Sequence, residues 1–138
     1  MKDYWIFPSN VKYFDIINYL NENRTIVWRR TASIHKGDIV YFYLAAPYAE
    51  IKYRGIVVDD DVAEEVIEKN SYAILKNGNK KAKYVQIEIE FEYPSGVLTR
   101  EELVKHGLGQ VQVQARIDRR LKPFISDVNM KLGIQEEE

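Results

Sequence analysis

Residues 37–58, with the sequence GDIVYFYLAAPYAEIKYRGIVV, form the stretch around which the rest of the chain is organised. Its first run, Ile39–Leu44, is apolar or aromatic at every position, which is typical of a central strand covered on both faces. Residues 51–58 predict a second strand with a bulge at Gly55. The loop between them contains Pro47, which cannot donate to a strand ladder. These features predict a strand pair joined by a short, proline-containing loop.

Composition places the chain among soluble globular proteins. It has 138 residues, of which 46% are hydrophobic and 30% are charged, and we expect one domain over residues 1–138. No apolar run is long enough for a bilayer and no signal-peptide pattern precedes Trp5, so we expect no membrane contact and a cytoplasmic location. The absence of cysteine excludes disulfides, thiol catalysis and thiolate metal sites.

The remaining patterns predict an α+β fold. Apolar periodicity, caps and turn residues predict strands at 4–7, 25–28, 72–75, 84–93 and 109–116, and helices at 13–22, 62–69, 99–106 and 117–132. The segment 84–93 is the clearest, because Val85, Ile87, Ile89 and Phe91 alternate with polar residues. The acidic segment 136–138 is expected to fray. The sum is a strongly bent mixed sheet or small barrel surrounded by several helices.

Motifs for catalysis and metal binding are absent from the sequence. There is no glycine-rich phosphate loop, no nucleophile elbow and no carboxylate set typical of a nuclease. His35 and His106 stand alone, and residues 59–61, three aspartates, lack the spacing of a calcium loop and predict a surface turn at a helix start. We therefore expect no cofactor, no metal and no enzymatic activity.

Aromatic and basic residues gather near the central strands. The chain has 10 Tyr, and several of its rings lie close in sequence to arginines such as Arg29 and Arg30. Stacking on a nucleobase while holding its phosphates requires this combination, and Ser9 and Asn10 could read the polar edge of the base. The alternative, that most tyrosines simply fill core and sheet positions, is left open by the sequence.

Four segments and one proline resemble a known family. Residues 4–10 (YWIFPSN), residues 26–30 (IVWRR) and residues 36–43 (KGDIVYFY), with Pro47 and residues 51–54, are similar to the EVE domain. The similarity is narrower to the EVE-like modules of HNH-type, modification-dependent restriction endonucleases. The EVE family belongs to the PUA-like superfamily, together with the YTH and ASCH domains.

This resemblance implies a PUA-like pseudobarrel that accepts a flipped, modified base, with 5-substituted cytosine in DNA as the first candidate. The implied base pocket consists of Ser9, Asn10, Trp28, Tyr41, Tyr43, Pro47 and Tyr48. The second cage tryptophan of the YTH branch has no counterpart here. HNH catalytic residues are absent, so cleavage would need a nuclease domain or a separate effector chain.

The net charge of −1 means that nucleic-acid backbone contacts require a local basic patch. The candidates for it are Arg29, Arg30, Lys52, Arg116, Arg119 and Arg120. Two other functions fit the same residues: an RNA-binding PUA-like module in translation or RNA modification, and a sensor of a small nucleotide-like ligand.

Overall fold

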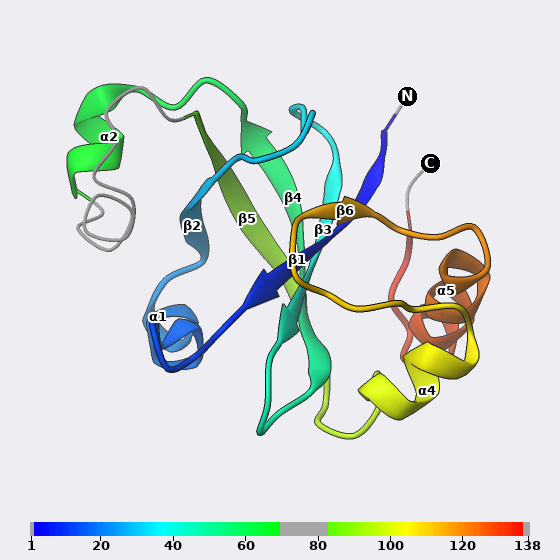
Figure 1. Cartoon of the computed structure of the whole chain (residues 1–138). Coiled ribbons are helices and arrows are strands. Elements are labelled where there is room, and N and C mark those ends of the chain that lie inside the picture. The colour runs from blue at the N-terminus through cyan, green and yellow to red at the C-terminus, as the bar shows by residue number, and fades with distance from the viewer. Residues whose placement is uncertain (1, 70–82, 137–138) are drawn as a thin grey trace.

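The computed structural model describes residues 2–69 and 83–136, and its centre is a six-stranded mixed sheet (Figure 1). The strands are β1 (Tyr4–Ser9), β2 (Thr25–Arg29), β3 (Ile39–Leu44), β4 (Glu50–Asp59), β5 (Tyr84–Glu92) and β6 (Ala115–Arg116). The helices of the described residues are α1 (Ile16–Glu22), α2 (Glu64–Lys69), α4 (Arg100–Lys105) and α5 (Leu121–Lys131). The expected α+β architecture is therefore confirmed.

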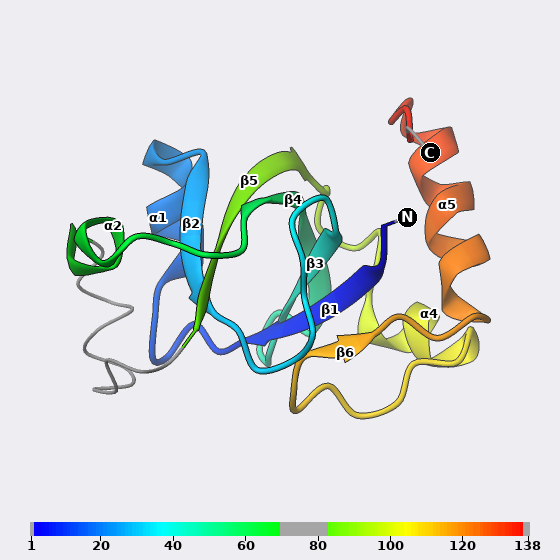
Figure 2. The same cartoon turned by 90° about the horizontal axis from the view of Figure 1, so that it is seen from above.

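The strand order is β2-β5-β4-β3-β1-β6, and the sheet is not closed. β1 runs parallel to β3, whereas the other neighbouring strands are antiparallel. The strands curve strongly, so that α1 and α2 lie at one side of the molecule and α4 and α5 at the other (Figure 2). The expected bent, mixed sheet with helices around it is what the chain forms.

β3 is buried at all six positions, and its two faces belong to two different hydrophobic cores. The first core contains Trp5, Phe7, Ile16, Ile26, Ile34, Val40, Phe42, Leu44, Tyr53, Val57, Val85 and Ile87. The second core contains Ile6, Ile39, Tyr41, Tyr43, Ile51, Tyr93, Leu98, Leu103, Leu121 and Ile125. Successive residues of a strand point to opposite faces, so α1 and β2 cover the first core, and α4 and α5 cover the second.

The buried carboxylate of Asp38 ties the start of β1 to the turn before β3. It accepts hydrogen bonds from the Trp5 indole Nε1 (2.9 Å), the backbone N–H of Asp3 (3.0 Å) and the backbone N–H of His35 (2.9 Å). The preceding Gly37 has φ +95°, a conformation that favours glycine. The expected turn ahead of the central strand is present, and both carboxylate oxygens of its aspartate accept hydrogen bonds.

Several boundaries differ from expectation. The helix expected from residue 13 begins at Ile16, because the Asp15 carboxylate accepts a hydrogen bond from the N–H of Asn18 and caps it. The first strand continues through Pro8 to Ser9; β6 pairs only with Trp5 and Ile6, so β1 is an edge at Pro8, where proline is tolerated.

One other expectation was wrong, one is covered only in part by the described residues, and one lies outside them. The strand expected over 109–116 is reduced to Ala115–Arg116, and the residues before it form no strand. Of the acidic segment 136–138 only Glu136 is described, and it accepts hydrogen bonds from Ser126 and Asn129. The strand expected over 72–75 falls in the undescribed range.

The expected bulge at Gly55 is present, and the absence of a side chain there is required. The register of β4 against β5 shifts between Arg54 and Gly55. A Cβ at Gly55 would lie 2.5 Å from Cγ2 of Ile87 and 2.9 Å from the carbonyl oxygen of Glu88. The bulge therefore lets β4 approach β5 closely.

We predict that Gly55→Ala lowers the free energy of unfolding by about 1–3 kcal/mol, because the added methyl overpacks the sheet. Urea unfolding measures this. Gly109→Ala is the matched control, since a Cβ there meets nothing within 4 Å, and it should change stability by less than about 0.5 kcal/mol. Equal effects of the two substitutions would contradict the close approach.

Candidate functional site

Trp28 lies near the end of β2 and packs on the first core without being fully buried. Its ring meets Phe42 edge-on, with centroids 5.3 Å apart, and is tilted against Phe14 at 6.0 Å. Phe14 in turn contacts Tyr19 of α1 at 5.6 Å. Aromatic rings from β2, β3 and the start of α1 therefore form one cluster, which we call the Trp28 cluster: Phe14, Tyr19, Trp28 and Phe42.

Two hydroxyls on the same face of the sheet have no hydrogen-bond partner among the described residues. Ser9 Oγ and Tyr53 Oη are both buried and unpaired, with exposed fractions of 3% and 1% for the two residues. Tyr53 belongs to the first core, and Ser9 follows Phe7 by two positions in β1, so it points to that face. A buried hydroxyl without a partner costs about 1–3 kcal/mol. Both hydroxyls thus keep unused hydrogen-bonding capacity inside the first core.

The environment of Tyr53 keeps its hydroxyl protonated. Burial raises the pKa of Tyr53 to about 12, and the carboxylates of Glu92 and Asp15 act in the same direction. Tyr48 also contributes to this raised pKa, which places it near Tyr53. At neutral pH the Tyr53 hydroxyl can therefore both donate and accept a hydrogen bond.

The other residues expected in the base pocket are distributed differently. Tyr41 and Tyr43 face the second core, on the side of β3 opposite to Phe42 and the Trp28 cluster. Asn10 forms a turn, its Oδ1 accepting from the N–H of Lys12. Pro47, after a cis peptide bond, and Tyr48 lie in the exposed loop between β3 and β4, with Tyr48 45% exposed.

The structure therefore brings Ser9 and Trp28 to one face and adds Tyr53, which was not among the expected pocket residues. A signal for it exists in the sequence: Tyr53 alternates with Lys52 and Arg54 along β4, which predicts that it points away from both cations.

Gln114 ties the backbone of residues 29–31 to the segment that leads into β6, and these segments carry three of the expected cations. Its Nε2 donates to the carbonyl oxygen of Arg29 (2.6 Å) and its Oε1 accepts from the N–H of Thr31 (2.8 Å). Arg30 lies between these two residues, and Arg116 follows Gln114 by two positions. The guanidinium of Arg116 lies 4.9 Å from the ring centroid of Trp5 and pairs with Asp3 at 3.3 Å.

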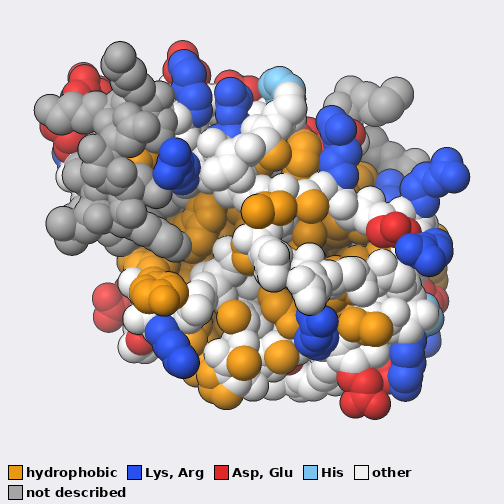
Figure 3. Space-filling model, viewed as in Figure 1, with side chains coloured by type: hydrophobic (Ala, Val, Ile, Leu, Met, Phe, Trp, Pro, Cys, Tyr) orange, Lys and Arg blue, Asp and Glu red, His pale blue; other side chains and the backbone are white. Residues whose placement is uncertain are grey.

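The other expected cations lie elsewhere. Lys52 donates to the carbonyl oxygen of Tyr93 and pairs with Glu92 at 3.6 Å. Arg119 and Arg120 are exposed before α5, where Arg120 pairs with Asp118 at 3.1 Å. In the view of Figure 3, hydrophobic side chains are exposed across the middle of the face, with Lys and Arg side chains around them.

A groove of about 360 Å³ lies next to the first core, between residues 20–24 and 89–92. Leu20 and Ile89 line it and also pack on that core. Its volume suits a small ligand, but Glu22, Glu90 and Glu92 line it against a single cation, Arg24. The carboxylates disfavour a phosphate in this groove.

Neither a cluster of metal-ligating side chains nor a membrane-spanning helix is present within residues 2–69 and 83–136. No group of three or more His, Asp or Glu side chains there is arranged to hold a metal ion. Two of the aspartates at 59–61 accept hydrogen bonds from the backbone. Asp59 accepts from the N–H of Asp61, and Asp60 accepts from the N–H of Lys36. No helix in these ranges has the length and apolar character needed to cross a bilayer.

Comparison with solved structures identifies the fold. The ASCH protein of Zymomonas mobilis superposes with a TM-score of 0.62, at 9% identity over 91% of this chain and 94% of its own. A hypothetical protein from Leishmania major has a TM-score of 0.65, at 16% identity over 96% of this chain and 98% of its own. A protein from Agrobacterium tumefaciens has a TM-score of 0.61, at 10% identity over 98% and 96%.

These likenesses confirm the expected PUA-like fold and place it beside ASCH domains. No family model matches the sequence, and no curated protein matches it either. At these identities the likeness shows the fold alone, and the narrower resemblance to EVE modules of restriction endonucleases gains no support beyond it.

We predict that Tyr53→Phe leaves the free energy of unfolding at pH 7 unchanged or raises it by about 1 kcal/mol, because it removes an unpaired buried hydroxyl. Tyr93→Phe is the matched control and should lose about 1–3 kcal/mol, since the Tyr93 hydroxyl donates to Asn129 Oδ1. Urea unfolding of both variants measures the difference. A loss at Tyr53 equal to that at Tyr93 would show that the Tyr53 hydroxyl is paired in solution.

The same variant tests the raised pKa. The folded-state pKa of Tyr53 is about 12 against an ordinary 10.0, so as pH rises the unfolded chain loses this proton first. Stability should therefore fall between about pH 10 and 12, and the fall should be shallower in Tyr53→Phe. Unfolding curves across this range give the slope, and identical slopes would contradict the buried environment of the phenol.

Proposed function

We propose that this chain is a non-catalytic nucleic-acid-binding module that accepts a flipped, modified nucleobase beside the Trp28 cluster. A 5-substituted cytosine in DNA is the first candidate for that base. The observation that carries the proposal is the pair of buried, unpaired hydroxyls, Ser9 Oγ and Tyr53 Oη, on the face where Trp28 is partly exposed. An aromatic wall with polar groups at its edge is what recognition of an extruded base requires.

The energies of the individual steps are compatible. Flipping a base out of a duplex costs a few kcal/mol, roughly what a stacked aromatic returns at about 1–3 kcal/mol per base. Hydrogen bonds from Ser9 and Tyr53 would relieve the penalty that each hydroxyl carries in the free protein. A methyl on the base adds only about 0.8 kcal/mol, so discrimination by methylation is modest unless the pocket fits tightly.

Backbone affinity would come from the cations near Gln114. Arg29, Arg30 and Arg116 lie close to the end of β2 and to β1, the two strands that hold Trp28 and Ser9. Because the net charge is −1, binding should depend on this local group and fall as salt rises. Arg119, Arg120 and Lys52 lie outside this group of cations and would contribute less. Arg116 pairs with Asp3 in the free protein, so it would exchange that carboxylate for a phosphate.

Any reaction on the nucleic acid would be performed elsewhere. The sequence carries no HNH motif, so a nuclease domain or a separate effector chain would supply cleavage. The solved neighbours support a PUA-like fold in general, and the choice of DNA over RNA rests on the resemblance of residues 4–10 and 26–30 to EVE modules. RNA binding and binding of a free nucleoside are the outcomes that the following experiment distinguishes.

We predict that Ser9→Ala weakens binding of a 5-methylcytosine oligonucleotide by about 5- to 30-fold, corresponding to one lost hydrogen bond to the base. Fluorescence anisotropy titrations with modified DNA, plain DNA, RNA and free nucleosides measure it. The variant removes a hydroxyl that bonds to no other residue in the described part of the chain, so its unfolding curve should match or exceed the parent's. Ser95→Ala, at an exposed serine, is the control and should bind like the parent.

Trp28→Ala tests the stacking wall and should weaken binding of every base-bearing ligand by about tenfold or more. Equal binding of all oligonucleotides by the parent, Ser9→Ala and Trp28→Ala would rule out base recognition at this face. Tight binding of RNA without any dependence on modification would replace the proposal by an RNA-binding role.

A further inference from the structure

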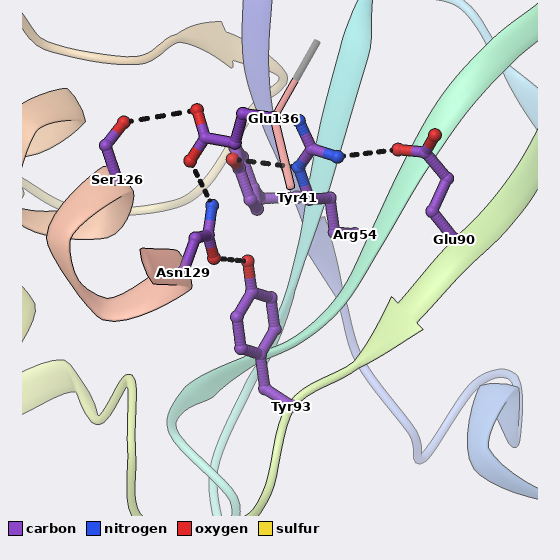
Figure 4. A network of polar contacts seen from close by, with 7 residues as sticks. All are labelled: Tyr41, Arg54, Glu90, Tyr93, Ser126, Asn129 and Glu136. Carbon is purple, nitrogen blue, oxygen red and sulfur yellow. Dashed lines mark hydrogen bonds and ion pairs between the residues drawn. The ribbon is translucent and has the colours of Figure 1, made fainter. Parts of the chain in front are cut away.

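A second polar site lies on the opposite face of the sheet, where α5 packs on the second core. It is the network of Tyr41, Arg54, Glu90, Tyr93, Ser126, Asn129 and Glu136 (Figure 4). These residues come from β3, β4, β5, α5 and the segment after α5. Because Trp28 and Ser9 lie on the first-core face, this network takes no part in the function proposed above.

Arg54 is the charged centre of the network. Its side chain is 4% exposed, and it leaves β4 at the bulge before Gly55. Nε donates to the Tyr41 hydroxyl (3.2 Å) and Nη1 donates to Glu90 Oε1 (2.7 Å). A guanidinium has five N–H donors, and within the described chain only these two side chains accept from it. A buried cation with donors to spare favours a further anionic acceptor.

An anionic group is already seated in the network, and it belongs to the chain itself. Glu136 Oε1 accepts from Asn129 Nδ2 (2.5 Å) and Oε2 accepts from Ser126 Oγ (3.3 Å). Both donors are neutral, and among the described residues no Lys or Arg forms an ion pair with this carboxylate. Glu136 thus fills the hydrogen-bonding positions of α5 without neutralising Arg54 directly.

The two tyrosines hold the donors in place. The Tyr93 hydroxyl donates to Asn129 Oδ1 (2.5 Å), which orients the amide so that its Nδ2 faces the carboxylate. Burial raises the pKa of Tyr41 and of Tyr93, so both phenols stay protonated at neutral pH. Asn129 is itself fully buried. The donors of Asn129 and Arg54 are therefore fixed before any ligand arrives, which reduces the entropy cost of binding.

We propose that Arg54, Ser126 and Asn129 form a binding site for a small oxyanion, a carboxylate or a phosphate, which Glu136 occupies in this structure. A free oxyanion has no tether to the backbone, so it can bond to Ser126 and Asn129 and also approach the unused donors of Arg54. Glu136 then acts as a displaceable occupant that competes with the ligand. Its removal should open the site.

Chemical rescue tests this proposal. Glu136→Ala removes the occupant, and thermal unfolding is followed in sodium acetate, in sodium phosphate and in sodium chloride at equal ionic strength and pH. We expect acetate or phosphate at tens of millimolar to raise the melting temperature of Glu136→Ala by about 3 °C or more above chloride. The parent chain, whose site is filled, should shift by less than about 1 °C.

Two further variants make the result specific. Asp127→Ala removes an exposed carboxylate of α5 that pairs with Lys131, and it should show no rescue. Ser126→Ala combined with Glu136→Ala removes one donor and should reduce the rescue by half or more. Glu136→Ser also removes the carboxylate and shortens the side chain, so it provides a second emptied background should Glu136→Ala fold poorly.

The two anions separate the ligand classes. A larger shift with phosphate than with acetate supports a phosphate ligand, and the reverse supports a carboxylate. Equal shifts in all three salts, or equal shifts in the parent and in both Glu136 variants, would overturn the proposal. These outcomes do not depend on nucleic-acid binding, so this site and the Trp28 face can fail independently.

Discussion

The burial of β3 on both faces is the constraint on which the rest of the structure depends. Since side chains alternate across a strand, Phe42 and Tyr41 are neighbours in sequence but belong to different cores. Each element that covers β3 therefore packs on one face only. α1 and β2 cover the face that belongs to the first core, and α4 and α5 cover the face that belongs to the second core. The molecule consequently has two interiors separated by one sheet, and each contains its own polar groups.

β4 extends this division to the candidate sites. Tyr53 and Arg54 are adjacent, and both are buried, yet the phenol lies in the first core and the guanidinium in the second. The bulge at Gly55 follows immediately and draws β4 against Ile87 and Glu88 of β5. Residues 53–55 of β4 thus set the position of the Tyr53 hydroxyl on one face and of the Arg54 guanidinium on the other.

The sequence predicts the strands better than the sites, for a physical reason. The run Ile39–Leu44 and the alternation of β5 identify buried strands because apolar spacing follows the period of the pleat. A run that is apolar on both faces, however, does not tell which face carries a pocket, so Tyr41 and Tyr43 could not be separated from the Trp28 side. The alternation at 109–116 gives a strand only at Ala115–Arg116, which pair with Trp5 and Ile6 of β1, while the Gln114 side chain bonds to the backbone of Arg29 and Thr31.

Contacts made by single polar side chains across long sequence distances leave no periodic signal. Glu136 carries no pattern that relates it to Asn129 or Ser126, and Asp38 carries none that relates it to Trp5. Asp38 nevertheless shows what a purely structural buried group looks like, because its carboxylate accepts three hydrogen bonds and nothing remains unpaired.

Ser9, Tyr53 and Arg54 differ from Asp38, because their polar groups are not fully hydrogen-bonded within the described residues. Alanine, phenylalanine and an unbranched apolar side chain would fill the same space without an unpaired hydroxyl or a partly bonded charge, and exchanges of this kind are often neutral or stabilising. Natural sequences depart from such local consistency mainly at functional sites. The two faces of β3 each show such a departure, and the two proposed ligands would each complete one of them.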